Sequence, residues 1–176
     1  VFDKIYDVHR TVMESDIAKA YAAEYERGKD QLSDVLRGIL ESGQRHLAVD
    51  YNRARDHMAL YNDLLDEIFQ SFDAIITPAT CGEAPLGLDS TGSPIFCTVW
   101  TFCGTPAITI PMLQGSNAMP MGVQVVGSQG DDARLLRTAH GVARALTQPR
   151  VHRDNPRGEG HSWHFKHLLG LKQKAG

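Results

Sequence analysis

Three histidines near the end of the chain have a spacing at which metal binding can be considered. His161, His164 and His167 are each three residues apart in the segment HSWHFKH. On a helix, side chains at i and i+3 share a face and can bind one metal ion, but the third member of such a series drifts around the face. No carboxylate is spaced to join them. We therefore expect adventitious nickel or zinc binding and no functional metal site.

The chain contains few of the residue patterns that a catalytic serine or cysteine requires. No G-x-S-x-G element follows a predicted strand, as it would in an α/β-hydrolase. Gly127-Ser128-Gln129-Gly130 lies between a predicted strand and a predicted helix, where it could bind an anion weakly or form a tight connection. A nucleophilic Cys97 or Cys103 would need a nearby histidine. His140 is the only one close in sequence, well along a predicted helix.

The cysteine count also bears on the compartment. Cys81, Cys97 and Cys103 make an odd number with no C-x-x-C pair, which favours free thiols in a reducing, cytoplasmic setting. We expect them to act as small, buried apolar residues. No phosphate-binding loop or dinucleotide fingerprint is present, so no cofactor is expected.

Composition indicates one globular domain. The 176 residues are 42% hydrophobic and 22% charged, which is ordinary for a soluble protein. No apolar run reaches about 18 residues, so no membrane span is expected. The opening Val1-Phe2-Asp3-Lys4 has a helical pattern, so no signal peptide is expected either.

Charge divides the chain into two parts. Residues 149–176 hold six lysines and arginines against two acids, a net charge of +4, so with −3 overall residues 1–148 carry −7. We expect one α/β domain over residues 1–148 and a basic, histidine-containing tail over 149–176. The tail has no aromatic interleaving or groove-entering motif, so nucleic-acid binding is not expected.

Apolar periodicity predicts three helices before the first strand. The first runs from an N-cap at Asp3 to about Gly28, and the second ends at a C-cap at Gly43. The third has the clearest helical period, and we expect its stripe to pack into the core. The stripe consists of Tyr51, Ala54, Met58, Tyr61, Leu65 and Ile68.

A small sheet is predicted after the third helix. Ala74–Ile76 is a short, wholly apolar run that favours a strand buried on both faces, in the middle of a sheet. Ala107–Ile110, closed by Pro111, and Gly122–Val126 are predicted to pair as an antiparallel hairpin. The expected fold is α/β, with helices packed on a small mixed sheet of about three strands.

Two further segments connect and close this sheet. Residues 79–95 form a long loop, which is either functional or a surface wrapping. Ile95–Cys103 is predicted to form a helical turn or two. Asp131-Asp132 is expected to cap a last helix that ends before Pro149.

The ordered set of motifs around the hairpin resembles the C-terminal part of the amidase signature family, whose serine amidohydrolases use a Ser–cis-Ser–Lys triad. The likeness covers roughly residues 5–148. The matching pieces are Asp73-Ala74-Ile75-Ile76-Thr77-Pro78-Ala79, Ala84-Pro85, Trp100-Thr101-x-x-Gly104-x-Pro106-Ala107, Pro111, Pro120-x-Gly122-x-Gln124-x-x-Gly127 and Ala133-x-Leu135-Leu136-x-x-Ala139.

The resemblance implies catalytic residues that this chain does not contain. No Ser-Ser pair and no Gly-Gly-Ser run occur, and no lysine lies between Asp30 and Phe165. In the family, the triad comes from a portion that precedes the part matched here. No catalytic residue is therefore assigned, and the chain alone is expected to be inactive.

The resemblance implies that the Ser93–Cys103 stretch contributes to a substrate pocket, with Cys97, Trp100 and Thr101 as substrate-binding residues. Structural packing of Trp100 stays open. The function implied is hydrolysis of a carbon–nitrogen amide bond in a small molecule, without metal or cofactor, by a longer parent protein. The alternative is a non-catalytic binding or assembly module with the same fold. Open apolar sheet edges in a fragment favour a homodimer.

Overall fold

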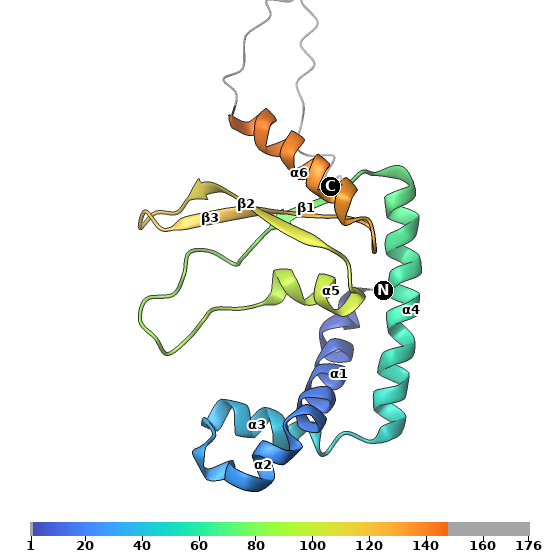
Figure 1. Ribbon diagram of the computed structural model, residues 1–176, viewed down its shortest axis with the longest axis vertical. Helices are drawn as coiled ribbons and strands as arrows, with labels where there is room; N and C mark the ends of the chain where they lie inside the picture. Colours follow the sequence, from blue (N-terminus) through green and yellow to red (C-terminus); the bar gives the residue numbers. More distant parts are fainter. Residues whose placement is uncertain (1, 148–176) are drawn as a thin grey trace, which may run out of the picture.

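The computed structural model describes residues 2–147, which form helices on both faces of a three-stranded sheet (Figure 1). The basic tail, including His161, His164 and His167, lies outside the described residues. In chain order the elements are η1 (Phe2–Lys4), α1 (Ile5–Ala20), α2 (Ala22–Gly28), η2 (Lys29–Gln31), α3 (Asp34–Gly43), α4 (Ala48–Ser71), β1 (Ile75–Pro78), α5 (Ile95–Cys103), β2 (Ala107–Gln114), β3 (Pro120–Val126) and α6 (Asp132–Thr147).

The sheet has the order β1-β3-β2, with β3 antiparallel to both neighbours. The predicted hairpin and the predicted number of strands are confirmed. Two expectations are corrected. The strand directions are not mixed among the described residues, and β1 lies at an edge rather than in the middle, with Ile76 52% exposed.

Strand β2 continues past the residue that was expected to end it. Pro111 lies inside β2, and the register with β3 shifts between Ile110 and Leu113. Proline has no N–H to give to a neighbouring strand, but on an edge strand its nitrogen can face away from the sheet. The outer position of β2 therefore explains why Pro111 does not end the strand.

Helix α6 covers one face of the sheet, and α5 lies on the other (Figure 1). Leu135 and Ala139 of α6 pack on Ile110 and Val125, which places α6 over β2 and β3. The predicted cap is confirmed, because the backbone N–H of Arg134 donates to Oδ1 of Asp131 at 3.3 Å.

A second core joins α5 to the long helices α1 and α4. The predicted α4 stripe is confirmed, since Ala54, Tyr61 and Leu65 are buried while the other members are half-buried. Phe102 of α5 lies edge-on to the Tyr61 ring, with the ring centroids 6.1 Å apart. This core holds α5 between the sheet and the helices.

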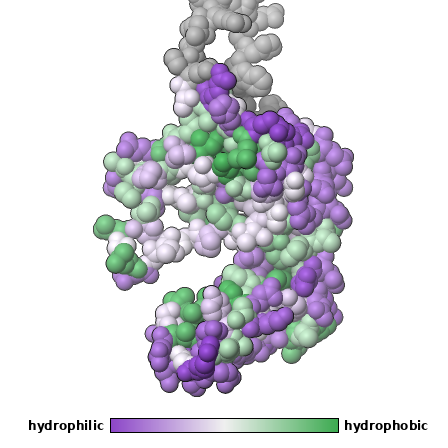
Figure 2. All heavy atoms as spheres, viewed as in Figure 1, coloured by the Kyte–Doolittle hydropathy of each residue, from purple (hydrophilic) through white to green (hydrophobic). Residues whose placement is uncertain are grey.

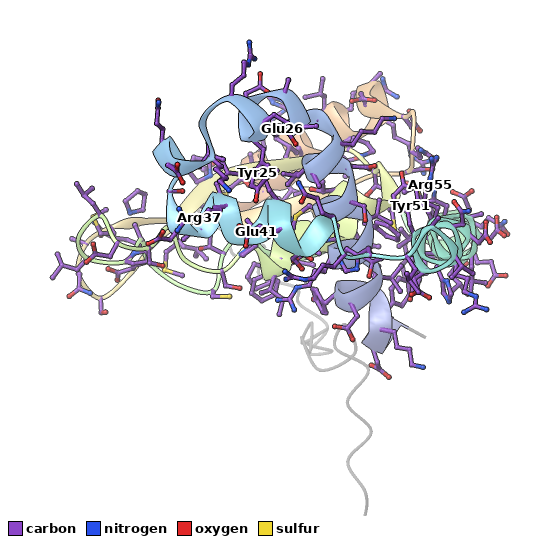
Figure 3. All side chains as sticks on the ribbon, turned by 90° about the horizontal axis from the view of Figure 1, so that it is seen from below. Tyr25, Glu26, Arg37, Glu41, Tyr51 and Arg55 are labelled. Atoms are coloured by element: carbon purple, nitrogen blue, oxygen red, sulfur yellow. The ribbon has the colours of Figure 1, made fainter. Side chains whose placement is uncertain are left out.

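The first predicted helix is divided in two. Helix α1 ends at Ala20, and α2 begins after Tyr21, whose φ of −103° and ψ of 17° interrupt the helical path. Lys4, and not Asp3, precedes α1. Helix α2 folds back onto α3, where the hydroxyl of Tyr25 donates to Oε1 of Glu41 at 3.1 Å (Figure 3).

Helices α1 and α3 approach each other closely around a buried carboxylate. Glu14 is only 9% exposed. Its Oε2 accepts a hydrogen bond from the Ser42 hydroxyl at 2.6 Å and lies 2.9 Å from Nε2 of His46. Burial alone would raise the pKa of Glu14, but the hydrogen bonds from Ser42 and His46 and the charges of His46 and Arg10 outweigh it and lower the pKa.

Among residues 2–147, none of the helices combines the length and apolar character needed to cross a bilayer.

Candidate functional site

Helix α5 presents the three residues expected to bind substrate. It begins after Pro94, whose carbonyl accepts the backbone N–H groups of Cys97 and Thr98 at 2.8 and 3.0 Å. It ends at Gly104, which adopts φ 65°, a left-handed conformation that glycine takes without steric penalty. Phe102 and Cys103 belong to the helical core, whereas the part of α5 that carries Cys97 and Thr101 is exposed.

Cys97, Trp100 and Thr101 lie along one face of α5 because they are spaced i, i+3 and i+4, with Trp100 at the border of the core. Cys97 and Thr101 are exposed and Trp100 is half-buried. The sequence-based hypothesis that the three act together is thus compatible with their placement on one helix face, and it stays a prediction.

Gln124 fixes the first turn of α5 on the sheet, and sequence reasoning did not assign it to the site. It is 4% exposed. Its Nε2 donates to the carbonyl of Phe96 at 2.9 Å and to the hydroxyl of Thr77 at 3.3 Å, and its Oε1 accepts from the Cys97 thiol at 3.9 Å. The sequence offered one indication of this role, because Gln124 is the single amide side chain among the valines of β3.

Trp100 carries a polar atom that has no partner among the described residues. The rest of the side chain packs against the core of α1, α4 and α5. Trp100 therefore has at least the structural packing role that the sequence left open. Its indole Nε1 is buried and makes no hydrogen bond there. A buried donor in this state costs free energy until something accepts from it. Trp100 can therefore offer a hydrogen bond to a ligand or to a further protein segment.

The long loop between β1 and α5 is tied to the hairpin turn by one carboxylate. Oε1 of Glu83 accepts the backbone N–H of Asn117 at 2.8 Å and the hydroxyl of Ser116 at 3.4 Å. Beyond this tether, Leu86 and Leu88 are fully exposed. Figure 2 shows apolar atoms at the protruding tip of this loop. It also shows a hollow between the layer formed by the sheet and α5 and the unit formed by α2 and α3. The loop is thus anchored to the hairpin turn near Glu83, and its tip is apolar and exposed.

The cysteines differ in their surroundings. Cys103 is buried, and burial raises the pKa of its thiol to about 11, which makes it a poor nucleophile. The expectation of a buried, apolar role holds for Cys103 but is wrong for Cys81 and Cys97, which are exposed. The thiol of Cys97 contacts the carbonyl of Ala79 and the amide of Gln124, and neither group can act as a base.

The remaining chemical candidates find little support in residues 2–147. No group of three or more histidine, cysteine, aspartate or glutamate side chains there could hold a metal ion. The segment 127–130 forms a tight connection, in which the N–H of Asp131 donates to the carbonyl of Ser128 at 3.2 Å. Asp131 itself then caps α6, so a carboxylate already occupies the position considered for an anion.

Comparison with known proteins identifies relatives of most of the described region. Residues 4–136 match the family described as Amidase. The chain is 36% identical over 127 residues to a glutamyl-tRNA(Gln) amidotransferase subunit of Cereibacter sphaeroides (strain ATCC 17029 / ATH 2.4.9), covering 67% of this chain and 26% of that protein.

Two solved structures share the fold. A crystal structure of an amidase aligns with a TM-score of 0.71 and 22% identity, covering 82% of this chain and 36% of the other. The structure of 6-aminohexanoate cyclic dimer hydrolase aligns with a TM-score of 0.66 and 20% identity, covering 78% and 34%. The chain thus spans about a quarter to about a third of the length of these proteins.

Proposed function

The chain belongs to the amidase family, and on that premise we propose that it is the C-terminal portion of an enzyme that hydrolyses carbon–nitrogen amide bonds. The chain spans 26% of the Cereibacter relative and 36% of the solved amidase. The activity therefore belongs to the longer protein, and this portion contributes sheet, helical cover and one wall of the substrate pocket.

In this proposal, the exposed side of α5 is the pocket wall. The observation that carries the assignment is the buried indole Nε1 of Trp100, which lacks an acceptor among the described residues. An amide substrate has a carbonyl oxygen that can accept from it. Cys97 and Thr101, one helical turn apart and exposed, supply the neighbouring contacts. Gln124 holds the first turn of this helix on the sheet.

The reaction itself requires groups from outside this chain. Amide hydrolysis needs a nucleophile, a base and donors for the developing oxyanion. The 176 residues contain no Ser-Ser pair and no lysine from Asp30 to Phe165, the stretch that includes the sheet and α5. We therefore propose that the chain alone binds but does not turn over small amides.

The test is to assay the 176-residue chain and the longest natural polypeptide that contains it, in parallel, on a panel of aryl and alkyl amides. The short chain is expected to be inert and unlabelled by a fluorophosphonate, whereas the longer protein is active and labelled. An inert longer protein would refute the proposal. Turnover by the short chain that survives Ser93→Ala and Ser128→Ala would reveal a different catalytic site, with Cys97 the first residue to replace.

The pocket assignment has its own variants in the active longer protein. Trp100→Phe keeps most of the ring but deletes the N–H, and it should raise KM with a smaller effect on kcat if the group binds substrate. Thr109→Val, on the exposed side of β2, is the matched control and should change neither constant. Equal kinetics for Trp100→Phe and the control would leave Trp100 with a packing role only.

The second candidate is a non-catalytic binding or assembly module that retains this fold. The absence of triad residues from the 176-residue sequence favours it. A natural polypeptide that contains this chain but carries no Gly/Ser-rich stretch and no lysine upstream would establish this alternative. We also propose that residues 1–148 form a single domain, followed by a basic tail.

A further inference from the structure

We propose that Cys81, in the loop after β1, and Cys97, in the first turn of α5, form a reversible disulfide bond when the chain meets a small-molecule disulfide. Both thiols are free and exposed in the structure, so a reagent in solution reaches either one. The inference concerns thiol chemistry within residues 2–147 and does not depend on the proposed function.

One backbone carbonyl brings the two cysteines to the same place. The thiol of Cys97 donates to the carbonyl of Ala79 at 3.8 Å. Cys81 is two residues beyond Ala79, and two residues of fully extended chain span at most about 7 Å. The chain turns here rather than running straight away from α5, because the hydroxyl of Thr80 donates to the carbonyl of Gly82 at 2.6 Å. The Cα atoms of a disulfide pair lie about 4.4–6.8 Å apart, a separation that a small shift of this turn reaches.

The two thiols differ in how firmly their backbones are held. Cys97 lies in the turn of α5 that Gln124 fixes on the sheet, through a hydrogen bond to the carbonyl of Phe96 at 2.9 Å. Cys81 lies in the turn before Gly82, where an added Cβ would meet nothing within 4 Å. One thiol is therefore held in place, and the other lies in a short turn with room to approach it.

Cys103 does not replace either member of the pair. It is 1% exposed and packs in the core of α1, α4 and α5. Cys97 and Cys103 are six residues apart on one helix, which separates them by about 9 Å along its axis, more than a disulfide spans. Burial also raises the pKa of the Cys103 thiol to about 11, so little reactive thiolate is present near neutral pH. The odd number of cysteines thus consists of an exposed pair and one buried thiol.

The oxidant is a small-molecule disulfide such as oxidised glutathione. One exposed thiolate attacks it, forms a mixed disulfide and releases one small thiol. The second protein thiol then attacks the protein sulfur of the mixed disulfide, and the departing small thiolate takes up the second proton from solvent. Two protein thiols are oxidised to one disulfide while the small disulfide is reduced to two thiols, and excess small thiol reverses the exchange. The bond ties the base of the loop to α5 and removes the Cys97 thiol from its exposed face.

The test treats the reduced 176-residue chain with one equivalent of the aromatic disulfide dithiobis(nitrobenzoate) at pH 8. Both halves of the reagent should be released, and the chain should lose the mass of two hydrogen atoms. Cys81→Ser and Cys97→Ser should each release one half and retain the other as a mixed disulfide, whereas Cys103→Ala should behave as the native chain. A native chain that retains half of the reagent, or a Cys81→Ser chain that still loses two hydrogens, would overturn the proposal.

A rate comparison separates a pair positioned by the fold from two cysteines that meet by chance sixteen residues apart. In Cys103→Ala, the mixed disulfide should close about tenfold or more faster in the native chain than in guanidinium chloride, because the fold raises the effective concentration of the second thiol. The control adds Cys97→Ser and Thr101→Cys, which move the thiol one turn along α5 to another exposed position, and should lose this advantage. Equal native and unfolded rates for Cys81 with Cys97 would overturn the proposal.

Peptide mapping locates the bond. Trypsin leaves all three cysteines in one peptide, because no lysine or arginine occurs between Arg55 and Arg134. Cleavage before Asp89 instead separates Cys81 from Cys97, so oxidised Cys103→Ala should yield these two fragments joined until a reductant is added. The yield should not change with chain concentration. A disulfide-linked dimer that grows with concentration, in place of the bond within one chain, would overturn the proposal.

Discussion

The backbone carbonyl of Glu14 lies less than 3.0 Å from the point where a side-chain Cβ on Gly43 would begin. Helices α1 and α3 therefore touch backbone to backbone at this position. The contact holds the carboxylate of Glu14 beside the hydroxyl of Ser42. The stability of the chain should therefore depend on both the size of residue 43 and the charge of residue 14.

Two glycines of α3 should respond in opposite directions to the same replacement. Gly43→Ala has no room against α1 and should destabilise the chain by about 1–3 kcal/mol or more, as overpacked cores do. Gly38→Ala meets nothing within 4 Å and should stabilise it by up to about 1 kcal/mol, because alanine favours a helix interior. Urea denaturation of both variants measures this. Equal midpoints would mean that α1 and α3 do not approach as described.

The Glu14 carboxylate should make stability depend on acid pH. Its pKa is lowered in the folded state from an ordinary value of about 4.5, so its contribution is fully present above that value. The contribution is lost as pH falls through the lower folded pKa. Denaturation midpoints from pH 7 to pH 3 should therefore fall more steeply for the native chain than for Glu14→Gln. Glu67→Gln, on an exposed position of α4, is the control and should keep the native slope.

The α4 stripe should be sensitive to truncation on its buried side only. Leu65 is 3% exposed, and Leu65→Ala should cost roughly 2–5 kcal/mol through lost burial and a residual cavity. Arg55 is exposed and lies over the Tyr51 ring, with 5.9 Å from its Cζ to the ring centroid (Figure 3). Arg55→Ala should cost about 0.5–1 kcal/mol. Thermal unfolding of the two variants measures the difference. Similar losses of stability would contradict the assignment of Leu65 to the buried face of α4 and of Arg55 to its exposed face.

The three thiols should separate by reactivity in the native chain. Cys81 and Cys97 are exposed and should react promptly with a disulfide reagent at pH 8. Cys103 is buried, with a pKa raised to about 11, so only about one molecule in a thousand carries its thiolate at that pH. Its reaction should wait for unfolding in guanidinium chloride. Cys103→Ala should remove the slow phase alone, and three fast thiols in the native chain would show that Cys103 is not enclosed.

Local patterns predict much of this fold, and tertiary context explains the rest. The α4 stripe and the β2–β3 hairpin follow from helical period and turn residues, which act within a few positions of each other. The expectation that Pro111 ends its strand is wrong, because a proline's effect depends on whether its nitrogen faces a neighbour. The apolar run of β1 suggests a central strand, and among residues 2–147 it is an edge.

The candidate site is predictable in part for the same reason. Cys97, Trp100 and Thr101 are selected through family resemblance, and α5 places them on one face. Gln124 falls within a matching motif but is not assigned to the site by sequence, because its contacts with Phe96 and Thr77 join three elements. The burial of Glu14 likewise depends on α3, which lies far along the chain. Contacts of this kind leave no periodic trace in a sequence.

The order of strands in the sheet has a consequence for how the chain folds. Strands β2 and β3 are joined by a short turn, and an isolated hairpin of this kind closes within about 1–10 microseconds. Strand β1 pairs with β3 through contacts that are distant in sequence, such as Ile75 opposite Val126. This pairing requires closure of the long loop and of α5 between the two strands, and closing a long segment slows folding. β1 is thus expected to join late, so nascent chains spend that interval with an apolar strand available to any neighbour.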